Sequence, residues 1–284
     1  ARLPTVLAWL EAAQPDVVGF QEIKCVDEKF PREAFESLGY NVETNGQKTY
    51  NGVALLSKYP LSDVRRGLPG VDAVALPAAL SAFDCRNHRL AWMGLQQDGF
   101  AERVREAVAR HGADRVGVFV GTSTSGILQT ELAYRERDPA TGALPAWFHY
   151  DTTHNTGSVS AFVRAAFGLQ GMAMALSSAC SSSAKVFAAA ARQLALGSID
   201  AAIVGGVDTL CLTTLYGFAS LQLTSKNPCR PYDASRDGIS IGEGAAFALL
   251  ERNTAPVSGT VMLLGVGESS DAYHMSSPHP EGLG

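Results

Sequence analysis

The sequence lacks the cysteine spacing of a disulfide scaffold or a zinc site. Its five cysteines are an odd number, they are widely spaced, and no two of them form a C-x-x-C pair. Reduced thiols of this kind are typical of proteins in a reducing compartment. The sequence also lacks an apolar run near the roughly 18 residues that a membrane-spanning helix needs, and a basic-then-apolar segment at its start. We therefore expect a cytoplasmic protein without a membrane partner.

Charge of either sign is also scarce. Charged residues make up 18% of the 284 residues, and the formal net charge is −5. This balance argues against a nucleic-acid partner, which would favour a basic domain. Hydrophobic residues make up 46% of the chain, enough for a sizeable core. The length fits one large domain or two modest ones.

The most informative motif that is present is Ser-Ser-Ala-Cys-Ser-Ser-Ser at residues 177–183. A short apolar run at 172–176 precedes it, and an alanine-rich helical run at 184–196 follows it. This pattern predicts a tight strand-to-helix turn with Cys180 at the N-terminus of the helix. Unpaired backbone N–H groups and the positive end of the helix dipole favour a thiolate there. Cys180 is therefore the candidate nucleophile, and the other cysteines are expected to be structural.

The two parts of the chain differ in their local patterns. Before residue 70 we expect helices at 3–13 and 31–38, and strands at 16–20 and 51–57. After residue 71 the sequence alternates between Gly- and Ala-rich strands and helices, which predicts a central sheet covered by helices. The expected strands are 116–120, 172–176, 201–205, 245–250 and 261–266, and the expected helices are 101–111, 156–167 and 184–196. The predicted fold class is therefore α/β.

Residues 71–284 resemble the β-ketoacyl-acyl-carrier-protein synthases. Besides the cysteine turn, the matching motifs are Val-Gly-Gly-Val-Asp at 204–208, Arg-Pro-Tyr-Asp-Ala-Ser-Arg-Asp-Gly at 230–238, Gly-Glu-Gly-Ala at 242–245 and Asp-Ala-Tyr-His-Met-Ser-Ser-Pro at 271–278. The resemblance implies a thiolase-like fold, with the first repeat nearly complete and the second only begun. We expect a chain that is truncated at both ends.

The resemblance also implies a reaction and its partners. Cys180 would take an acyl group from a phosphopantetheine thioester, and decarboxylative Claisen condensation with a malonyl group would follow, in fatty-acid or polyene biosynthesis. Phe218 matches an aromatic residue of the acyl pocket, although a plain core role fits equally well, and His274 falls in the family's gate loop. The implied partners are an acyl carrier protein and a second copy of the chain. No bound cofactor or metal is implied, because the phosphopantetheine arrives on the carrier.

The histidines decide how far this reaction could go. In the family, two histidines in His-Gly-Thr and Asn-x-x-x-Gly-His contexts stabilise the enolate, and neither context occurs in the sequence. We therefore expect acylation of Cys180 without a completed condensation. The histidines outside the gate loop have no motif, and surface or loop positions are expected for them: His88, His111, His149 and His154.

Residues 1–70 resemble the N-terminal part of the exonuclease III type of AP endonuclease. The matching motifs are Pro-Asp-Val-Val at 15–18, Gln-Glu-Ile-Lys-Cys at 21–25 and Tyr-Asn-Gly-Val-Ala at 50–54. Glu22 matches a Mg²⁺ ligand of that family, and carboxylates suit Mg²⁺, but the family's other ligands have no counterpart here. We expect Glu22 to be vestigial and the junction to lie near Gly70. A Mg²⁺-dependent DNA-repair nuclease and an inactive chimeric fragment are the alternative interpretations.

Overall fold

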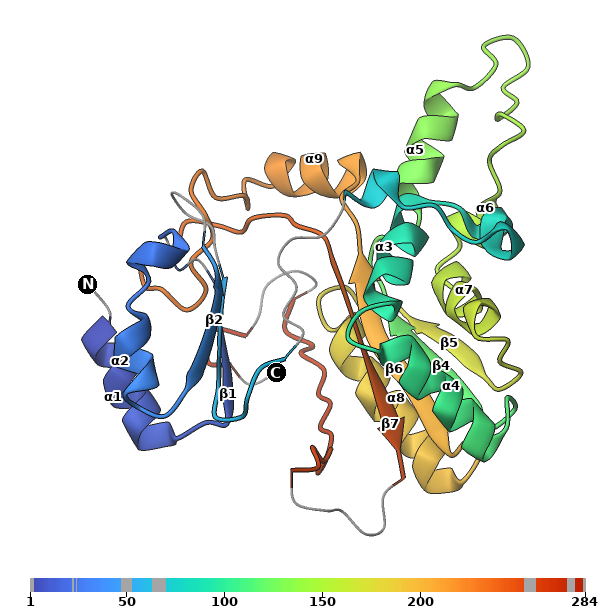
Figure 1. The fold of residues 1–284 in the computed structure, drawn as a ribbon. Coiled ribbons are helices and arrows are strands. Elements are labelled where there is room, and N and C mark those ends of the chain that lie inside the picture. The colour runs from blue at the N-terminus through green and yellow to red at the C-terminus, as the bar shows by residue number, and fades with distance from the viewer. Residues whose placement is uncertain are drawn as a thin grey trace. The chain divides into compact units, whose positions relative to one another are not determined.

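The chain divides into two compact units (Figure 1). The computed structural model describes residues 3–21, 23, 25–46, 53–62, 70–252, 259–274 and 279–282. The first unit comprises Ala1–Pro69 and Tyr216–Ile241, and the second comprises Gly70–Leu215 and Gly242–Gly284. The predicted sequence domains, 1–70 and 71–284, remain a prediction, because compactness does not reveal the origin of a segment.

A three-stranded antiparallel sheet organises the first unit. Its strand order is β1-β3-β2, with strands Val17–Gln21 (β1), Asn41–Asn45 (β2) and Val53–Ser57 (β3). Two α-helices and a short 3-10 helix accompany it: Leu3–Ala13 (α1), Arg32–Glu36 (α2) and Asp27–Lys29 (η1). Their apolar faces meet the sheet in one small core: Leu10, Phe35, Tyr40, Val42, Ala54 and Leu56. This unit therefore has a core of its own.

A four-stranded mixed sheet organises the second unit. Its strand order is β5-β4-β6-β7, with strands Val116–Gly121 (β4), Ala173–Leu176 (β5), Ala201–Asp208 (β6) and Gly244–Glu251 (β7). The first three strands run parallel to one another, and β7 is antiparallel to β6. Strand β4 is buried along its whole length, as expected for a strand in a sheet covered on both faces.

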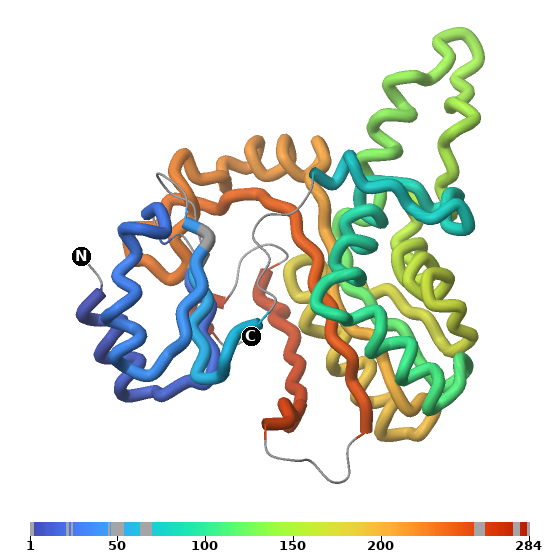
Figure 2. Tube along the Cα trace, in the orientation of Figure 1, coloured from blue at the N-terminus to red at the C-terminus, as the bar shows by residue number. Residues whose placement is uncertain are grey.

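Helices cover both faces of this sheet (Figure 2). Side chains alternate along β4, so Val118 and Val120 contact one helical layer while Phe119 contacts the other. The first layer consists of Arg86–Leu95 (α3), Phe100–His111 (α4) and Ser158–Ala166 (α7). The second layer is Ser182–Leu196 (α8), which packs through Val186 and Ala190. Each fully buried aliphatic or aromatic side chain stabilises the fold by about 1.5–3 kcal/mol.

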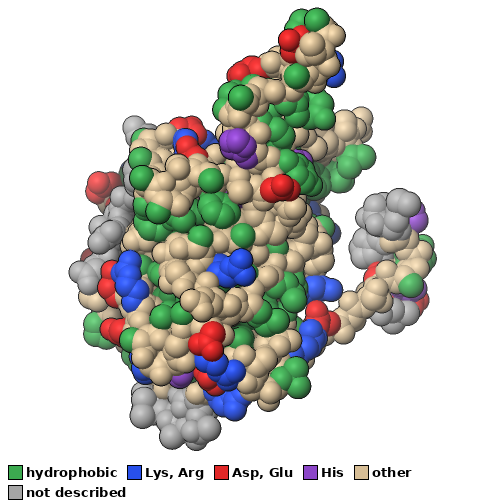
Figure 3. Space-filling view, turned by 90° about the vertical axis from the view of Figure 1, so that its right-hand side faces the viewer, with side chains coloured by type: hydrophobic (Ala, Val, Ile, Leu, Met, Phe, Trp, Pro, Cys, Tyr) green, Lys and Arg blue, Asp and Glu red, His purple; other side chains and the backbone are tan. Residues whose placement is uncertain are grey.

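The remaining elements are not counted in these two layers. They are the helices Ile127–Arg135 (α5), Tyr150–Thr153 (α6) and Leu212–Ser220 (α9), and the 3-10 helices Val71–Ala73 (η2) and Ala78–Phe83 (η3). Of these, η2 and η3 place Val71 and Leu80 in the core beside the first layer. Among the residues that the structure describes, no helix combines the length and the apolar character needed to cross a membrane. On the face shown in Figure 3, acidic and basic side chains are interspersed.

The predicted strand at 261–266 is wrong. Residues 259–274 lie outside helices and strands, and Val261 is 97% exposed. A strand forms only where a neighbouring segment accepts its backbone hydrogen bonds, and the described part of the chain offers this run no such neighbour. The predicted strands at 116–120, 172–176, 201–205 and 245–250 are confirmed within a few residues.

The surface or loop position predicted for His88 is also wrong. His88 lies on α3 with none of its surface exposed, and its ring stacks on Phe162 with the centroids 4.9 Å apart. Its Nδ1 lies 2.6 Å from the carbonyl oxygen of Phe83. Burial disfavours the imidazolium and lowers the pKa of His88 to about 4. His88 is therefore a neutral core residue.

This burial makes the stability of the second unit depend on pH. Between pH 6.5 and about 4 the unfolded chain binds a proton at His88 that the folded chain does not bind, so the free energy of unfolding falls as the pH falls. Lowering the pH from 7 to 5 should remove roughly 2 kcal/mol through this group. Urea unfolding of the wild type and His88→Gln at both pH values measures the contribution.

The exposed residue His149 offers the control. We expect His149→Gln to keep the pH dependence of the wild type and His88→Gln to weaken it. An equal loss of stability in His88→Gln and the wild type would contradict a neutral, buried imidazole.

Candidate active site

Cys180 lies in the connection between β5 and α8. Strand β5 ends at Leu176 and α8 begins at Ser182, with Ser181 at the N-cap position. The predicted strand-to-helix turn is therefore present, with Cys180 directly ahead of the cap and exposed to solvent. The positive end of the helix dipole of α8 lies beside this thiol.

The turn depends on an unusual backbone conformation. Ala179, directly before Cys180, has φ +53°, in the left-handed region. For a residue with a Cβ this conformation costs about 1–3 kcal/mol, so it persists only where surrounding contacts impose it. One contact is the hydroxyl of Ser182, which accepts the N–H of Ser178 at 2.9 Å and donates to the carbonyl oxygen of Ala179 at 2.6 Å. Ser182 is only 2% exposed, so this bridge is shielded from water.

The first turn of α8 rests directly on the ends of two parallel strands. A Cβ added to Gly121, at the end of β4, would lie 2.6 Å from the carbonyl carbon of Ser182 and from the nitrogen of Ser183. A Cβ added to Gly206, on β6, would lie 2.0 Å from the hydroxyl oxygen of Ser183. Only glycine leaves room for the helix at these two positions. The distance between the cysteine turn and the sheet is therefore set by the close approach of α8 to these two glycines.

Asp208 joins the end of β6 to the loop that follows β4. Its Oδ1 accepts hydrogen bonds from the N–H groups of Ser123 and Thr124, at 2.7 and 2.8 Å, and from the hydroxyls of Thr122 and Thr124, at 2.9 and 3.0 Å. The hydroxyl of Ser123 then donates to the carbonyl oxygen of Ala179 at 3.0 Å. Hydrogen bonds to an ionised carboxylate are stronger than those between neutral groups.

Sequence reasoning did not assign Ser123, Ser182 or Asp208 to the site. A signal was present, because polar residues follow the strands at 116–120 and 201–205, and parallel strands bring their carboxyl ends to one edge of a sheet. Which of these hydroxyls face the turn depends on the register of β4 against β6 and β5. That register is a tertiary property.

The described thiols differ in their surroundings. Cys85 is almost completely buried, and this burial raises its pKa to about 11. Burial also raises the pKa of Cys25, with a contribution from the negative charge of Asp27. A thiol with a raised pKa holds less thiolate at neutral pH and is a weaker nucleophile. Cys180 differs from both because it is exposed at a helix N-terminus.

Glu243, which stands between two glycines, is engaged in an ion pair. Arg86 donates to both of its carboxylate oxygens, at 2.9 and 2.6 Å, and the N–H of Leu210 donates to it at 3.1 Å. The hydrogen bonds from Arg86 lower the pKa of Glu243. This carboxylate therefore joins α3 to the segment that precedes β7.

The other predicted site residues lie in different parts of the chain. Phe218 is half-buried on α9 and belongs to the first compact unit, whereas Cys180 belongs to the second. His274 is exposed in the irregular segment 259–274. Glu22 falls outside the described residues. Within the described ranges, no three His, Cys, Asp or Glu side chains form a group that could hold a metal ion.

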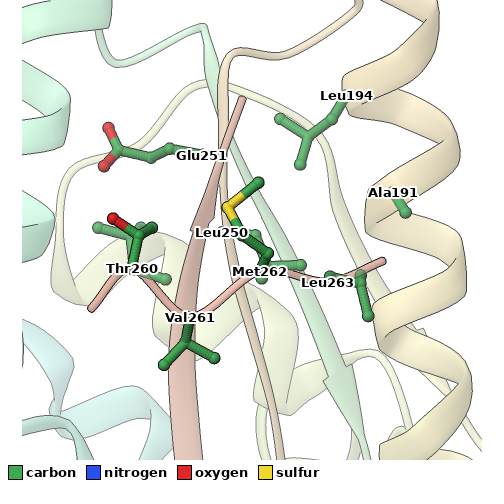
Figure 4. A pocket seen from close by; sticks show the side chains of 9 residues that line it. Ala191, Leu194, Leu250, Glu251, Thr260, Val261, Met262 and Leu263 are labelled. Atoms are coloured by element: carbon green, nitrogen blue, oxygen red, sulfur yellow. The ribbon is translucent and has the colours of Figure 1, made fainter. Parts of the chain in front are cut away.

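A pocket of about 410 Å³ lies near the opposite end of α8 (Figure 4). Its walls are Ala191 and Leu194 of α8, the end of β7 and residues 260–263. Leu194 comes 14 positions after Cys180 in the sequence, which corresponds to roughly 20 Å along a helix. The pocket is therefore separate from the cysteine turn.

Comparison with known proteins identifies the family. Residues 77–255 match the model of the β-ketoacyl synthase N-terminal domain. The chain therefore belongs to the β-ketoacyl synthase family of condensing enzymes. Residues 3–120 match the endonuclease/exonuclease/phosphatase family model, which supports the nuclease-like segment. The two matched ranges overlap between residues 77 and 120.

Individual relatives agree with this assignment. The ketosynthase ApeO of Xenorhabdus doucetiae, solved in complex with its chain length factor ApeC, is 34% identical and has a TM-score of 0.66, with 94% of this chain and 63% of that chain covered. Nodulation protein E of Rhizobium meliloti is 28% identical over 89% of this chain and 61% of its own length. The 3-oxoacyl-[acyl-carrier-protein] synthase 2 of Staphylococcus aureus is 27% identical over 88% of this chain and 66% of its own length.

These matches confirm the predicted thiolase-like α/β fold with a nuclease-like segment before it. A β-ketoacyl synthase from Burkholderia phymatum, 24% identical with a TM-score of 0.51, shares the fold. The chain spans about three fifths of the length of the curated relatives that it matches.

The contact between α8 and the sheet can be tested with one methyl group. Gly121→Ala should destabilise the protein by about 1–3 kcal/mol, because its Cβ meets the backbone of Ser182 and Ser183, which cannot rotate away. Gly244→Ala is the matched control, since it lies in the same sheet with no atom within 4 Å of the added Cβ. Urea unfolding measures the stability of both variants. Equal stabilities of Gly121→Ala and Gly244→Ala would contradict the close contact between Gly121 and α8.

Proposed function

We propose that Cys180 is the acyl acceptor of a β-ketoacyl-acyl-carrier-protein synthase. In this step the thiolate of Cys180 attacks the carbonyl carbon of an acyl thioester carried on phosphopantetheine. The carbon–sulfur bond to the carrier breaks, acyl-Cys180 forms, and the pantetheine sulfur leaves as a thiolate that takes up a proton. Membership of the condensing-enzyme family supports this assignment. The single structural observation that carries it is the exposed thiol in a fixed turn at the N-terminus of α8.

The surroundings of the turn suit a thioester substrate. The neighbours of Cys180 in the turn are serine and alanine, whose small side chains leave the sulfur accessible. A positioned nucleophile lowers the barrier because the substrate carbonyl needs only to arrive in line with it. We further propose that Phe218 lines the acyl pocket and that His274 belongs to a gate beside it, as the family resemblance implies. The reaction would serve fatty-acid or polyene biosynthesis.

The second half of the reaction needs groups that stabilise the enolate of the malonyl unit. Such stabilisation requires donors aimed at the developing negative charge. None of the six histidines stands in either sequence context that supplies these donors in the family. We therefore propose that these 284 residues form acyl-Cys180 but no malonyl-dependent carbon–carbon bond. Formation of a β-ketoacyl product by this chain would overturn that part of the proposal.

Acylation is tested by mixing the chain with an acyl thioester of an acyl carrier protein. Mass spectrometry of the digested protein should find the acyl group on the peptide that contains Cys180, because this thiol is exposed while Cys85 is buried with a raised pKa. Cys180→Ala should abolish the label, and the matched variant Cys229→Ala should keep it. Absence of the label, or equal labelling of all thiols, would reject the proposal.

We also propose that the chain pairs with a second copy through β5. This strand lies at one edge of the four-stranded sheet, and Met174 on it is 40% exposed. An uncovered strand edge offers unpaired backbone groups to another chain. The solved ketosynthase ApeO forms a complex with its chain length factor. That complex supports the idea that a ketosynthase pairs with another chain. For the present chain we propose that the partner is an identical copy.

A charge at this edge should separate the two copies. Met174→Lys places an ammonium group on one face of the edge strand, among the side chains that would pack against an added strand. We therefore expect a dimer for the wild type and a monomer for the variant in light scattering after size exclusion. Leu196→Lys, at an exposed position near the end of α8, is the control and should remain dimeric. A monomeric wild type, or a dimer that survives Met174→Lys, would exclude pairing through β5.

A further inference from the structure

The backbone conformation of Ala179 is held by hydrogen bonds from inside and from outside its own turn. Its left-handed backbone, with φ +53°, sets the direction in which the next residue, Cys180, leaves the turn. The hydroxyl and the N–H of Ser182 both donate to the Ala179 carbonyl oxygen, at 2.6 and 3.1 Å, and Ser182 lies on α8 itself. Bonds from Ser182 tie the turn to the sheet only indirectly, through the contact of α8 with Gly121 and Gly206.

A third hydrogen bond to this carbonyl oxygen comes from outside α8. The hydroxyl of Ser123, in the loop after β4, donates to the same carbonyl oxygen at 3.0 Å. Ser123 is exposed, and it is 56 residues away from Ala179 in the sequence. This hydrogen bond therefore joins the cysteine turn to the end of the central strand.

The loop that carries Ser123 is held in turn by Asp208. One carboxylate oxygen of Asp208 accepts four hydrogen bonds from residues 122–124. Two of the residues that donate to it, Thr122 and Thr124, are buried. The hydroxyl of Thr124 also accepts a hydrogen bond from the N–H of Thr209 at 3.0 Å. The loop is therefore held by hydrogen bonds to two consecutive residues, to the side chain of Asp208 and to the backbone of Thr209.

We infer that Ser123 and Asp208 are positioning residues for Cys180. Asp208 fixes the 122–124 loop, and the hydroxyl of Ser123 transmits that position to the Ala179 carbonyl and so to the cysteine. The inference rests on the proposed function in that it takes Cys180 as the acyl acceptor. It adds the claim that a contact from another strand sets the direction of attack, because a rigid sheet holds a reacting group more firmly than a loop does.

Ser123→Ala is the decisive variant. Because Ser123 is exposed, removal of its hydroxyl should leave the thermal midpoint unchanged while slowing acylation of Cys180 by up to about tenfold, the factor that one hydrogen bond can supply. Ser123→Thr keeps a hydroxyl and should acylate at close to the wild-type rate. Ser198→Ala is the matched control, since Ser198 donates to a carbonyl oxygen at the other end of α8 at the same distance of 3.0 Å, and it should leave the rate unchanged.

Asp208→Asn tests the connection between the two residues. It should slow acylation in the wild-type background but add little in the Ser123→Ala background, because both residues act through one hydrogen bond. Fully additive effects of the two substitutions would show that Asp208 does not act through Ser123. If Asp208→Asn lowers the thermal midpoint, its acylation rate reflects a general loss of stability. The acylation rates of Ser123→Ala and Ser123→Thr then test the inference.

Amide hydrogen exchange separates this inference from the proposed function. In Ser123→Ala the peptide that covers residues 177–183 should exchange faster, while the peptides of α4 and α7 should not change. If the wild type is never acylated, the proposed function fails. The exchange data still test whether the hydrogen bond from Ser123 to Ala179 holds the cysteine turn. Wild-type exchange and a wild-type acylation rate in Ser123→Ala would overturn the inference.

Discussion

Close contact between the first turn of α8 and the glycines of two parallel strands fixes the position of the site. Gly121 and Gly206 allow Ser182 and Ser183 to approach closer than any side chain would permit. Because β4 and β6 are buried in the centre of the sheet, they cannot move away from the helix. The position of the helix N-terminus, and with it the position of Cys180, follows from this contact.

The polar groups around the turn then fix its conformation. Parallel strands present their carboxyl ends at one edge of the sheet, and this edge collects the hydroxyls after β4 and the carboxylate after β6. Each group has a partner there: Asp208 holds the 122–124 loop, Ser123 reaches the cysteine turn, and Ser182 closes that turn from within. Together these bonds offset the cost of the left-handed Ala179 and leave the thiol itself exposed.

The first compact unit differs from the second in its sheet and in its core. Its sheet is antiparallel and small, and its core depends on one face of α1 and on the aromatic residues Phe35 and Tyr40. The match to the endonuclease/exonuclease/phosphatase family covers this part of the chain and extends to residue 120. Residues 216–241, which carry the Arg-Pro-Tyr-Asp motif, group with this unit. Local sequence patterns gave no indication of that grouping, because it joins segments far apart in the chain.

The elements whose pattern is local could be predicted from the sequence: α1 from its helical spacing, the apolar strands β4 and β6, and α8 with its glycine stop. The sequence also determined the family and the candidate nucleophile, because the motif around Cys180 is contiguous. Which apolar runs form strands depends on tertiary contacts. The sequence pattern did not predict β2, and the run at 261–266 lacks a strand partner within the described chain. The tertiary structure likewise decided that His88 is buried and that Ser123 and Asp208 reach the cysteine turn. Burial and hydrogen bonding between distant segments depend on strand order and register, and no local pattern encodes these.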